Sequence, residues 1–151
     1  MMSITHAVSG AYIASVLPNP LLYVPLALAC HYAQDFIPHW DFGTGIKKGV
    51  RSIKATFMFA LIDLIIAALL IMIFWQQTPF DFNIHIWMGA FAGIFPDLME
   101  APTTFLGMKM KFLRPLAHLH DVVHHSTTSI AWGILPQLLI IVTVGYLALL
   151  G

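Results

Sequence analysis

The 151-residue chain is 59% hydrophobic and 9% charged, with a mean hydropathy of +0.83 and a formal net charge of zero. Soluble domains carry about 25% charged residues, so the composition is typical of a membrane protein. Zero net charge gives no support for nucleic-acid binding, and the single cysteine, Cys30, excludes an internal disulfide and a multi-cysteine zinc site. The length suits one integral-membrane helical domain, residues 1–151.

The N-terminal apolar region is interrupted by Pro18-Asn19-Pro20, which predicts a turn between helices at 5–17 and 21–36. Each of these arms is short for a full span, so we expect a helical hairpin that dips into the membrane. The start of the chain has no basic region, and His6 interrupts its first apolar run, so we do not expect a signal peptide.

Two later segments, Ile53–Trp75 and Ile130–Leu150, have the roughly 20 apolar residues that a membrane span needs. A third, at 84–95, is apolar but is soon followed by acids, and the mixed segment 109–125 predicts a short interfacial helix. The expected fold is therefore all-α, a polytopic bundle of the hairpin, about three further membrane helices and the interfacial helix. Asp63 lies within the first span, where we favour a hydrogen bond to a neighbouring helix over a proton or metal role.

All seven lysines and arginines lie in two connections, at 47–54 and 109–114, and the connection between them, 76–83, has none. The positive-inside rule places both basic connections in the cytoplasm. We therefore predict a protein of the cytoplasmic (inner) membrane.

Seven of the eight histidines and five of the seven acids fall in four stretches, at 5–6, 31–41, 97–100 and 118–125. The predicted topology brings all four to the cytoplasmic boundary and leaves only His85 on the opposite side. Ionisable groups are costly near hydrocarbon, so a cluster of them at one depth predicts a functional site that faces the cytoplasm.

The spacing within these stretches is typical of metal ligands. His31 and Asp35 are four residues apart and share a helix face, as do His120 and His124. Asp35 and His39 have the same spacing, although Pro38 is expected to end the helix first. Imidazole and carboxylate together suit a divalent metal, zinc first and manganese or iron as the other candidates. The alternative for any single pair is an ordinary hydrogen-bonded polar pair.

Asp97 and Glu100 are three residues apart and follow Pro96, which we expect to begin a helix. The core metal ligands that we predict are His31, Asp35, Asp97, His120 and His124. Further ligands, supporting groups or acid–base groups are expected among His6, His39, Glu100, Asp121 and His125.

Short pieces spread over most of the chain resemble the YdjM-like inner-membrane metal-dependent hydrolases, which are distantly similar to zinc-dependent phospholipase C. The pieces are Thr5-His6-Ala7-Val8-Ser9-Gly10, the segment from Leu28 to Asp35 with its His-x-x-x-Asp pattern, Gly93-Ile94-Phe95-Pro96-Asp97, and His124-His125-Ser126. The resemblance implies hydrolysis of a phosphoester-like bond by a metal-bound water.

The chain departs from this family pattern at three points. The His-x-x-x-Asp helix precedes the Pro-Asp element, so the order of the motifs is permuted. Met99 stands where the family has its second aspartate, with Glu100 beside it, and no arginine follows His124.

Together these observations predict a membrane hydrolase of phosphoester substrates. A divalent metal lowers the pKa of bound water to about 7, Glu100 or Asp121 accepts or relays a proton, and Arg114 orients a phosphate. Membrane lipid is the expected partner, and a lipid or lipid-linked phosphoester is the natural substrate for a site at the headgroup level. The main alternative is a divalent metal-binding or transport protein without hydrolytic activity; a b-type haem protein and a structural scaffold are the other classes.

Overall fold

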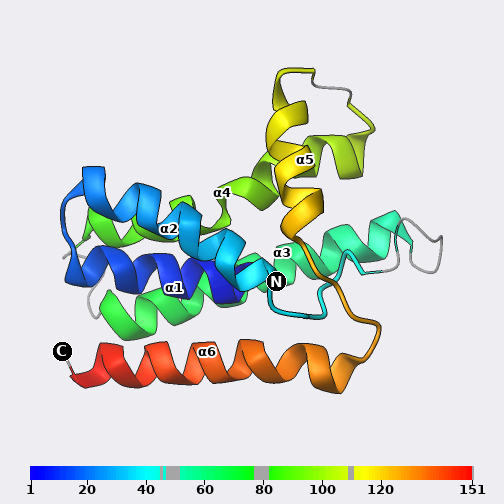
Figure 1. Ribbon diagram of the computed structural model, residues 1–151. Helices are drawn as coiled ribbons and strands as arrows, with labels where there is room; N and C mark the ends of the chain where they lie inside the picture. The colour runs from blue at the N-terminus through cyan, green and yellow to red at the C-terminus, as the bar shows by residue number, and fades with distance from the viewer. Residues whose placement is uncertain (45, 47–51, 77–81, 109–110, 151) are drawn as a thin grey trace.

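A computed structural model describes residues 1–44, 46, 52–76, 82–108 and 111–150 (Figure 1). Within these ranges the chain is all-α, as predicted, and its only β-type pairing is an isolated bridge between His39 and Ser126. The helices are α1 (Ser3–Val16), α2 (Pro20–Asp35), α3 (Ile53–Trp75), α4 (Ile84–Leu106), the short 3₁₀ helix η1 (Lys111–Leu113), α5 (Arg114–Val123) and α6 (Ile130–Leu150).

The N-terminal hairpin is confirmed, because α1 and α2 flank the predicted proline turn and lie side by side (Figure 1). The Asn19 side chain caps α2 by accepting a hydrogen bond from the Leu21 amide at 3.0 Å. Pro20 occupies the first position of α2, where its missing N–H costs no helical hydrogen bond.

Helix α1 lies inside the bundle and packs tightly on α4. A Cβ at Gly10 would lie 2.2 Å from the carbonyl oxygen of Gly89, and one at Gly93 would lie 2.3 Å from that of His6. The absence of side chains at these positions therefore allows two helix backbones to meet. This contact holds His6 and Gly10 of α1 against the first half of α4.

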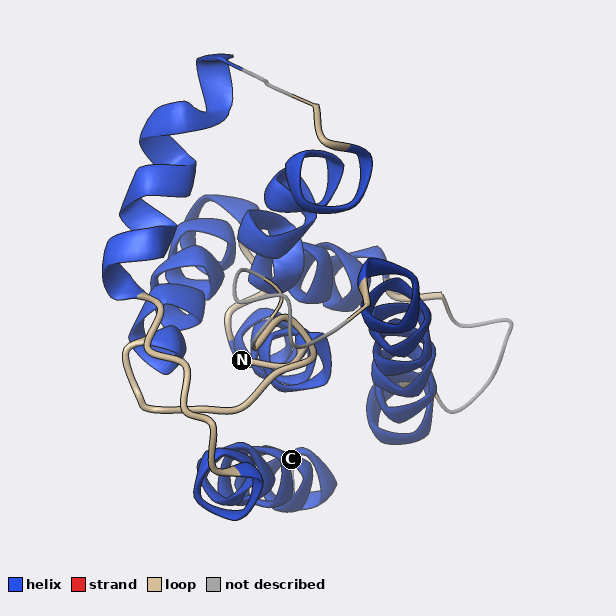
Figure 2. Cartoon of the chain, turned by 90° about the vertical axis from the view of Figure 1, so that its right-hand side faces the viewer, coloured by secondary structure: helices blue, strands red, loops and turns tan. Residues whose placement is uncertain are grey.

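Helices α3 and α6 are each long and apolar enough to cross a membrane, over the residues that the sequence predicted. Most of their apolar side chains face outward rather than into the bundle. In Figure 2 α6 lies at the edge of the molecule, next to the C label, whereas the N-terminus is near the centre. This arrangement supports a membrane location for the two helices.

Asp63 of α3 accepts hydrogen bonds from the backbone amides of Ser3 and Ile4 at 2.6 and 3.2 Å. These are free donors in the first turn of α1, so Asp63 acts as a helix cap supplied by another helix. The expected hydrogen bond to a neighbouring helix is confirmed. Asp63 lies ten residues after Ile53, the first residue of α3. The start of α1 therefore contacts α3 about 15 Å from the beginning of that helix.

The prediction that Pro96 begins a helix is wrong, because Pro96 lies inside α4. A proline within a helix removes one backbone hydrogen bond and displaces a carbonyl one turn earlier, yet the helix can continue beyond it. Helix α4 indeed changes direction along its length (Figure 1). Four of the basic residues used for the topology, Lys47, Lys48, Arg51 and Lys109, lie outside the described residues, as does Asp81.

Candidate metal centre

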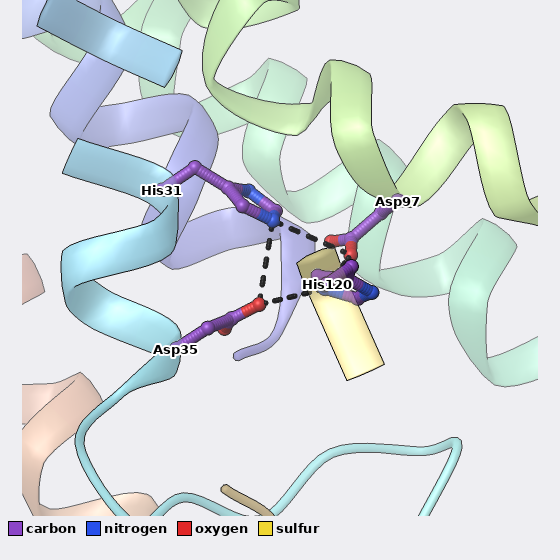
Figure 3. A group of neighbouring side chains, drawn as sticks. All are labelled: His31, Asp35, Asp97 and His120. Atoms are coloured by element: carbon purple, nitrogen blue, oxygen red, sulfur yellow. Dashed lines mark hydrogen bonds and ion pairs between the residues drawn. The ribbon is translucent and has the colours of Figure 1, made fainter. Parts of the chain in front are cut away.

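Four predicted ligands from three helices meet in the interior of the protein (Figure 3). We call His31, Asp35, Asp97 and His120 the first donor set; one atom from each lies within 4.8 Å of all the others. Asp35 Oδ2 is 2.9 Å from His120 Nε2 and 3.3 Å from His31 Nε2. Asp97 Oδ1 is 3.5 Å from His120 Nε2 and 3.8 Å from His31 Nε2.

The tautomer of His31 prepares it to bind a metal. Its Nδ1 donates to the carbonyl oxygen of Gly93 at 2.7 Å, beside the proline bend in α4. With Nδ1 engaged in this way, a neutral ring presents the lone pair of Nε2 to Asp35 and Asp97. Nε2 is buried and forms no hydrogen bond with the described residues. A lone pair aimed at carboxylates is repulsive, and a cation between them would make the contact favourable.

His120 is oriented by a carboxylate on the opposite side of its ring. Its Nδ1 lies 2.9 Å from Glu100 Oε1, while Nε2 faces Asp35. Burial alone would lower the pKa of His120, but the neighbouring carboxylates of Asp35 and Glu100 outweigh it and raise the pKa to about 10. A histidine that donates one ring N–H to a carboxylate and offers the other nitrogen to a metal is a common pair in metal sites.

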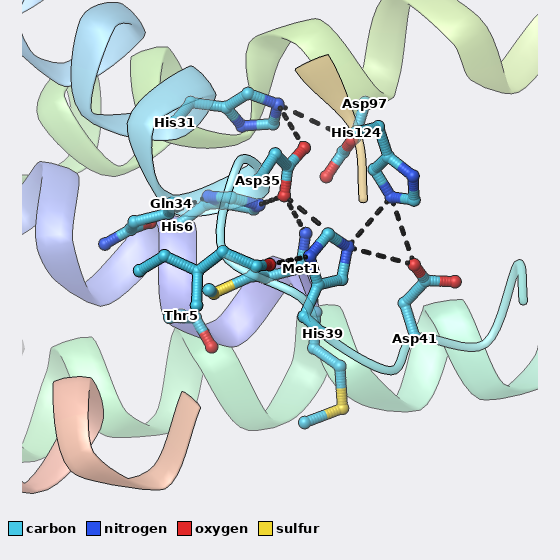
Figure 4. Close-up of polar contacts among 12 residues, drawn as sticks. Met1, Thr5, His6, His31, Gln34, Asp35, His39, Asp41, Asp97 and His124 are labelled. Carbon is cyan, nitrogen blue, oxygen red and sulfur yellow. Dashed lines mark hydrogen bonds and ion pairs between the residues drawn. The ribbon is translucent and has the colours of Figure 1, made fainter. Parts of the chain in front are cut away.

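Three further side chains form a second group beside the first (Figure 4). We call His39, Asp41 and His124, together with Asp35, the second donor set. The Nε2 atoms of His39 and His124 are 2.9 Å apart, and Asp41 Oδ2 lies 3.3 Å from the former and 3.1 Å from the latter. Asp35 Oδ1 lies 3.7 Å from His39 Nε2.

The two donor sets share Asp35, which presents Oδ2 to the first and Oδ1 to the second. Its side chain is fully buried, and Oδ1 also contacts His6 Nε2 at 3.1 Å and the amino group of Met1. Burial alone would raise the pKa of Asp35, but its contacts with the rings of His120, His31 and His6 hold the pKa well below its ordinary value. Asp35 is therefore ionised and is the negative centre of the cluster.

Backbone pairing assembles the second donor set, whose side chains lie outside regular helices. His39 donates its amide to the His125 carbonyl at 3.0 Å, and its own carbonyl accepts from the Thr127 amide at 2.7 Å. The His125 amide donates to the carbonyl of Asp35 at 2.9 Å. The segment after α2 is thus held against the segment after α5, which brings His39 and His124 together.

Donor chemistry and spacing both fit a metal ion. Zinc–ligand bonds of about 2.0–2.2 Å put two ligands of one ion roughly 3–4 Å apart, the spacing found within both sets. Besides His31 Nε2, Asp41 Oδ2 is buried without a hydrogen bond among the described residues. Burial alone would raise the pKa of Asp41, but the nearby rings of His124 and His39 lower the pKa instead. The geometry by which a metal ion could be held is met by His31, Asp35, Asp97 and His120, and separately by Asp35, His39 and His124; Asp41 lies beside the second of these groups.

The remaining predicted residues lie around the two donor sets rather than in them. His6 is buried, and its Nδ1 lies 2.8 Å from Gln34 Oε1. His125 is exposed, with Nδ1 donating to the Val123 carbonyl at 2.6 Å. Arg114 and Asp121 are exposed on α5 and line a pocket next to His120.

Two participants, Asp41 and Gln34, were not among the predicted site residues. Asp41 follows His39 by two residues, and the signal for it was its place at the end of the 31–41 stretch. A two-residue spacing does not place two side chains on one face of a helix, so the sequence did not mark Asp41 as a ligand. The backbone pairing of this segment with the one after α5 brings Asp41 next to His124. Gln34 donates to Ser9 Oγ at 2.6 Å and orients His6; a glutamine in an apolar helix gave no specific signal.

Comparison with known proteins yields no relative from which a role could be transferred: no family model matches the chain, and neither a curated protein nor a solved structure matches it.

Proposed function

We propose that the protein is a membrane-embedded, metal-dependent hydrolase that acts on a phosphoester-type substrate. The observation that carries the proposal is the sharing of buried Asp35 between two sets of histidine and carboxylate donors. A buried structural polar cluster would satisfy its hydrogen bonds internally. Here His31 Nε2 and Asp41 Oδ2, one in each donor set, form none among the described residues.

The metal we propose is zinc, because histidine nitrogen and aspartate oxygen are among its usual ligands. Residues of both donor sets would hold it, and two ions could share Asp35. When bound, a divalent metal supplies Lewis acidity and a nucleophilic water at neutral pH. The protein's own groups supply ligand orientation, substrate placement and proton transfer.

Glu100 and Asp121 take different roles in this proposal. Glu100 is engaged with His120 Nδ1 at 2.9 Å and would keep that ring in place. Asp121, exposed in the pocket, would move the proton. Arg114 forms no ion pair with the described residues and would orient the phosphate.

A pocket beside the first donor set would hold the substrate. Its volume is about 570 Å³, and it lies between α2, α4 and α5. His120, Arg114 and Asp121 provide its polar side, and Leu28 and Phe95 are among its apolar lining residues. Polar and apolar surfaces in one pocket suit a lipid or lipid-linked phosphoester.

The setting we propose is the cytoplasmic (inner) membrane, with the site facing the cytoplasm. Helices α3 and α6 would span the bilayer, the hairpin and α4 would complete a polytopic bundle, and α5 would lie at the interface. The distribution of basic residues supports this orientation. The motif resemblance to the YdjM-like hydrolases agrees with the proposed chemistry.

Elemental analysis combined with hydrolysis assays tests the proposal. We expect detergent-purified protein to contain zinc, Asp97→Ala to lose about half of that zinc together with the activity, and His85→Ala, whose histidine contacts Tyr23 away from the donor sets, to retain both. Protein that holds no metal and cannot be loaded contradicts the proposal. Metal that binds without hydrolysis of any phosphoester, and that moves across vesicles, favours the transport alternative.

A further inference from the structure

Gln137 is a polar side chain in the apolar helix α6 that sequence spacing did not single out. It is completely buried and uses both ends of its amide. Nε2 donates to the carbonyl oxygens of Trp40 and Gly133, each at 2.7 Å. Oε1 accepts from the Met2 amide at 2.8 Å and from Thr5 Oγ1 at 3.5 Å.

One of these contacts fixes the backbone between two ligands of the second donor set. Trp40 stands between His39 and Asp41, and its carbonyl accepts from Gln137. Its amide donates to the Gly133 carbonyl at 3.1 Å, so α6 satisfies both backbone groups of Trp40. A Cβ on Gly133 would lie 2.4 Å from the Trp40 nitrogen, which leaves no space between the helix and this segment.

The other contacts reach the start of α1. Met2 and Thr5 lie in the first turn of that helix or just before it, and Thr5 is adjacent to His6. His6 Nε2 in turn contacts Asp35, the ligand shared by both sets. Gln137 thus links α6 to two segments. One is the segment that carries His39 and Asp41, and the other is the start of α1.

We propose that Gln137 is a positioning residue of the metal centre, holding His39 and Asp41 at the spacing that the second donor set requires. The inference rests on the proposed function, because it requires that the set binds a metal. An amide is needed because only it can donate two hydrogen bonds and accept two. An ionised glutamate cannot donate, and methionine fills a similar volume without either capacity.

The test is a cobalt titration of the full-length protein, purified in detergent and stripped of metal. Visible absorption of bound Co²⁺ reports ligand number and geometry, which overall stability alone does not change. We expect Gln137→Met to weaken one class of Co²⁺ sites about ten-fold. Its spectrum should resemble that of Asp41→Asn, a ligand of the second set, and not that of Asp97→Asn, a ligand of the first.

Gly133→Ala provides an independent variant, because the added methyl displaces Trp40 while Gln137 remains. It should produce the same spectral change. Thr143→Val is the matched control: it removes a polar side chain from an exposed position further along α6 and should leave titration and spectrum unchanged.

The outcomes separate the inference from the proposed function. Wild-type binding and spectra in both folded Gln137→Met and Gly133→Ala overturn the positioning role while metal binding stands. A change in Thr143→Val as large as that in Gln137→Met also overturns it. Wild-type protein that binds no Co²⁺ refutes the proposed metal centre and this inference with it.

Discussion

The two donor sets use the same residue types but are built differently. Three residues of the first set project from α2 and α4, and the fourth, His120, projects from α5. In the second set, His39, Asp41 and His124 lie on the segments that follow α2 and α5, and backbone hydrogen bonds align those segments. Asp35 belongs to both.

This difference in construction predicts different metal affinities for the two sets and different sensitivities to substitutions elsewhere. Helix-borne ligands are placed by packing that includes the tight glycine contact between α1 and α4. Ligands on connecting segments depend on a few hydrogen bonds, including those from α6. We therefore expect the first set to bind metal more tightly, and the second to be more sensitive to changes outside its ligands.

Asp35→Asn should have the largest effect, because it removes the only charge common to both sets. We expect the metal affinity of both donor sets to fall by more than about 100-fold, which exceeds the effect of removing a group that only supports a ligand. Hydrolysis should be lost as well. Elemental analysis after dialysis measures this. Asp121→Asn, at an exposed position, is the control that should keep its metal; retention of full metal by Asp35→Asn would contradict the shared-ligand arrangement.

Asp97→Asn and Asp41→Asn should each remove about half of the bound metal, because each carboxylate belongs to one set only. The measurement is metal per chain in each variant and in the double variant, which should hold none. Complete loss in either single variant would mean that the two sets act as one site, and the comparison between them would fail.

Glu100→Gln should weaken binding at the first set by roughly 10- to 100-fold, the range found when a histidine ligand loses its supporting carboxylate. Chelator competition with zinc gives the affinity of each site separately. The second set, which does not contact Glu100 among the described residues, serves as the internal reference. Equal weakening at both sets would indicate a general loss of structure instead.

The smallest expected effect is on the number of protons released when zinc binds. Because the pKa of His120 is raised to about 10, its ring is fully protonated in the metal-free protein at lower pH. Zinc binding at about pH 8 must displace that proton. Calorimetric titration in two buffers of different ionisation enthalpy counts the protons released. Glu100→Gln removes one carboxylate that raises this pKa, so fewer protons should be released; equal release from both proteins would argue against the assignment.

Much of the cluster was predictable because helical periodicity turns sequence spacing into geometry. The pair His31 and Asp35 shares a face of α2 as their four-residue spacing predicts. His120 and His124 have that spacing as well, yet they serve different sets because α5 ends at Val123. Pro96 misled the prediction of a helix start because a buried, well-packed helix can continue through a proline.

The sequence by itself determined the helical class, the bounds of α3 and α6, and which stretches carry the histidines and acids, because hydropathy and periodicity are local properties of the chain. Tertiary structure decided which of those groups meet. Asp41 became a candidate ligand, and Asp63 and Gln137 became partners of α1, only through contacts between segments 59 to 135 residues apart. Such contacts depend on packing of the whole bundle, which no local pattern in the sequence specifies.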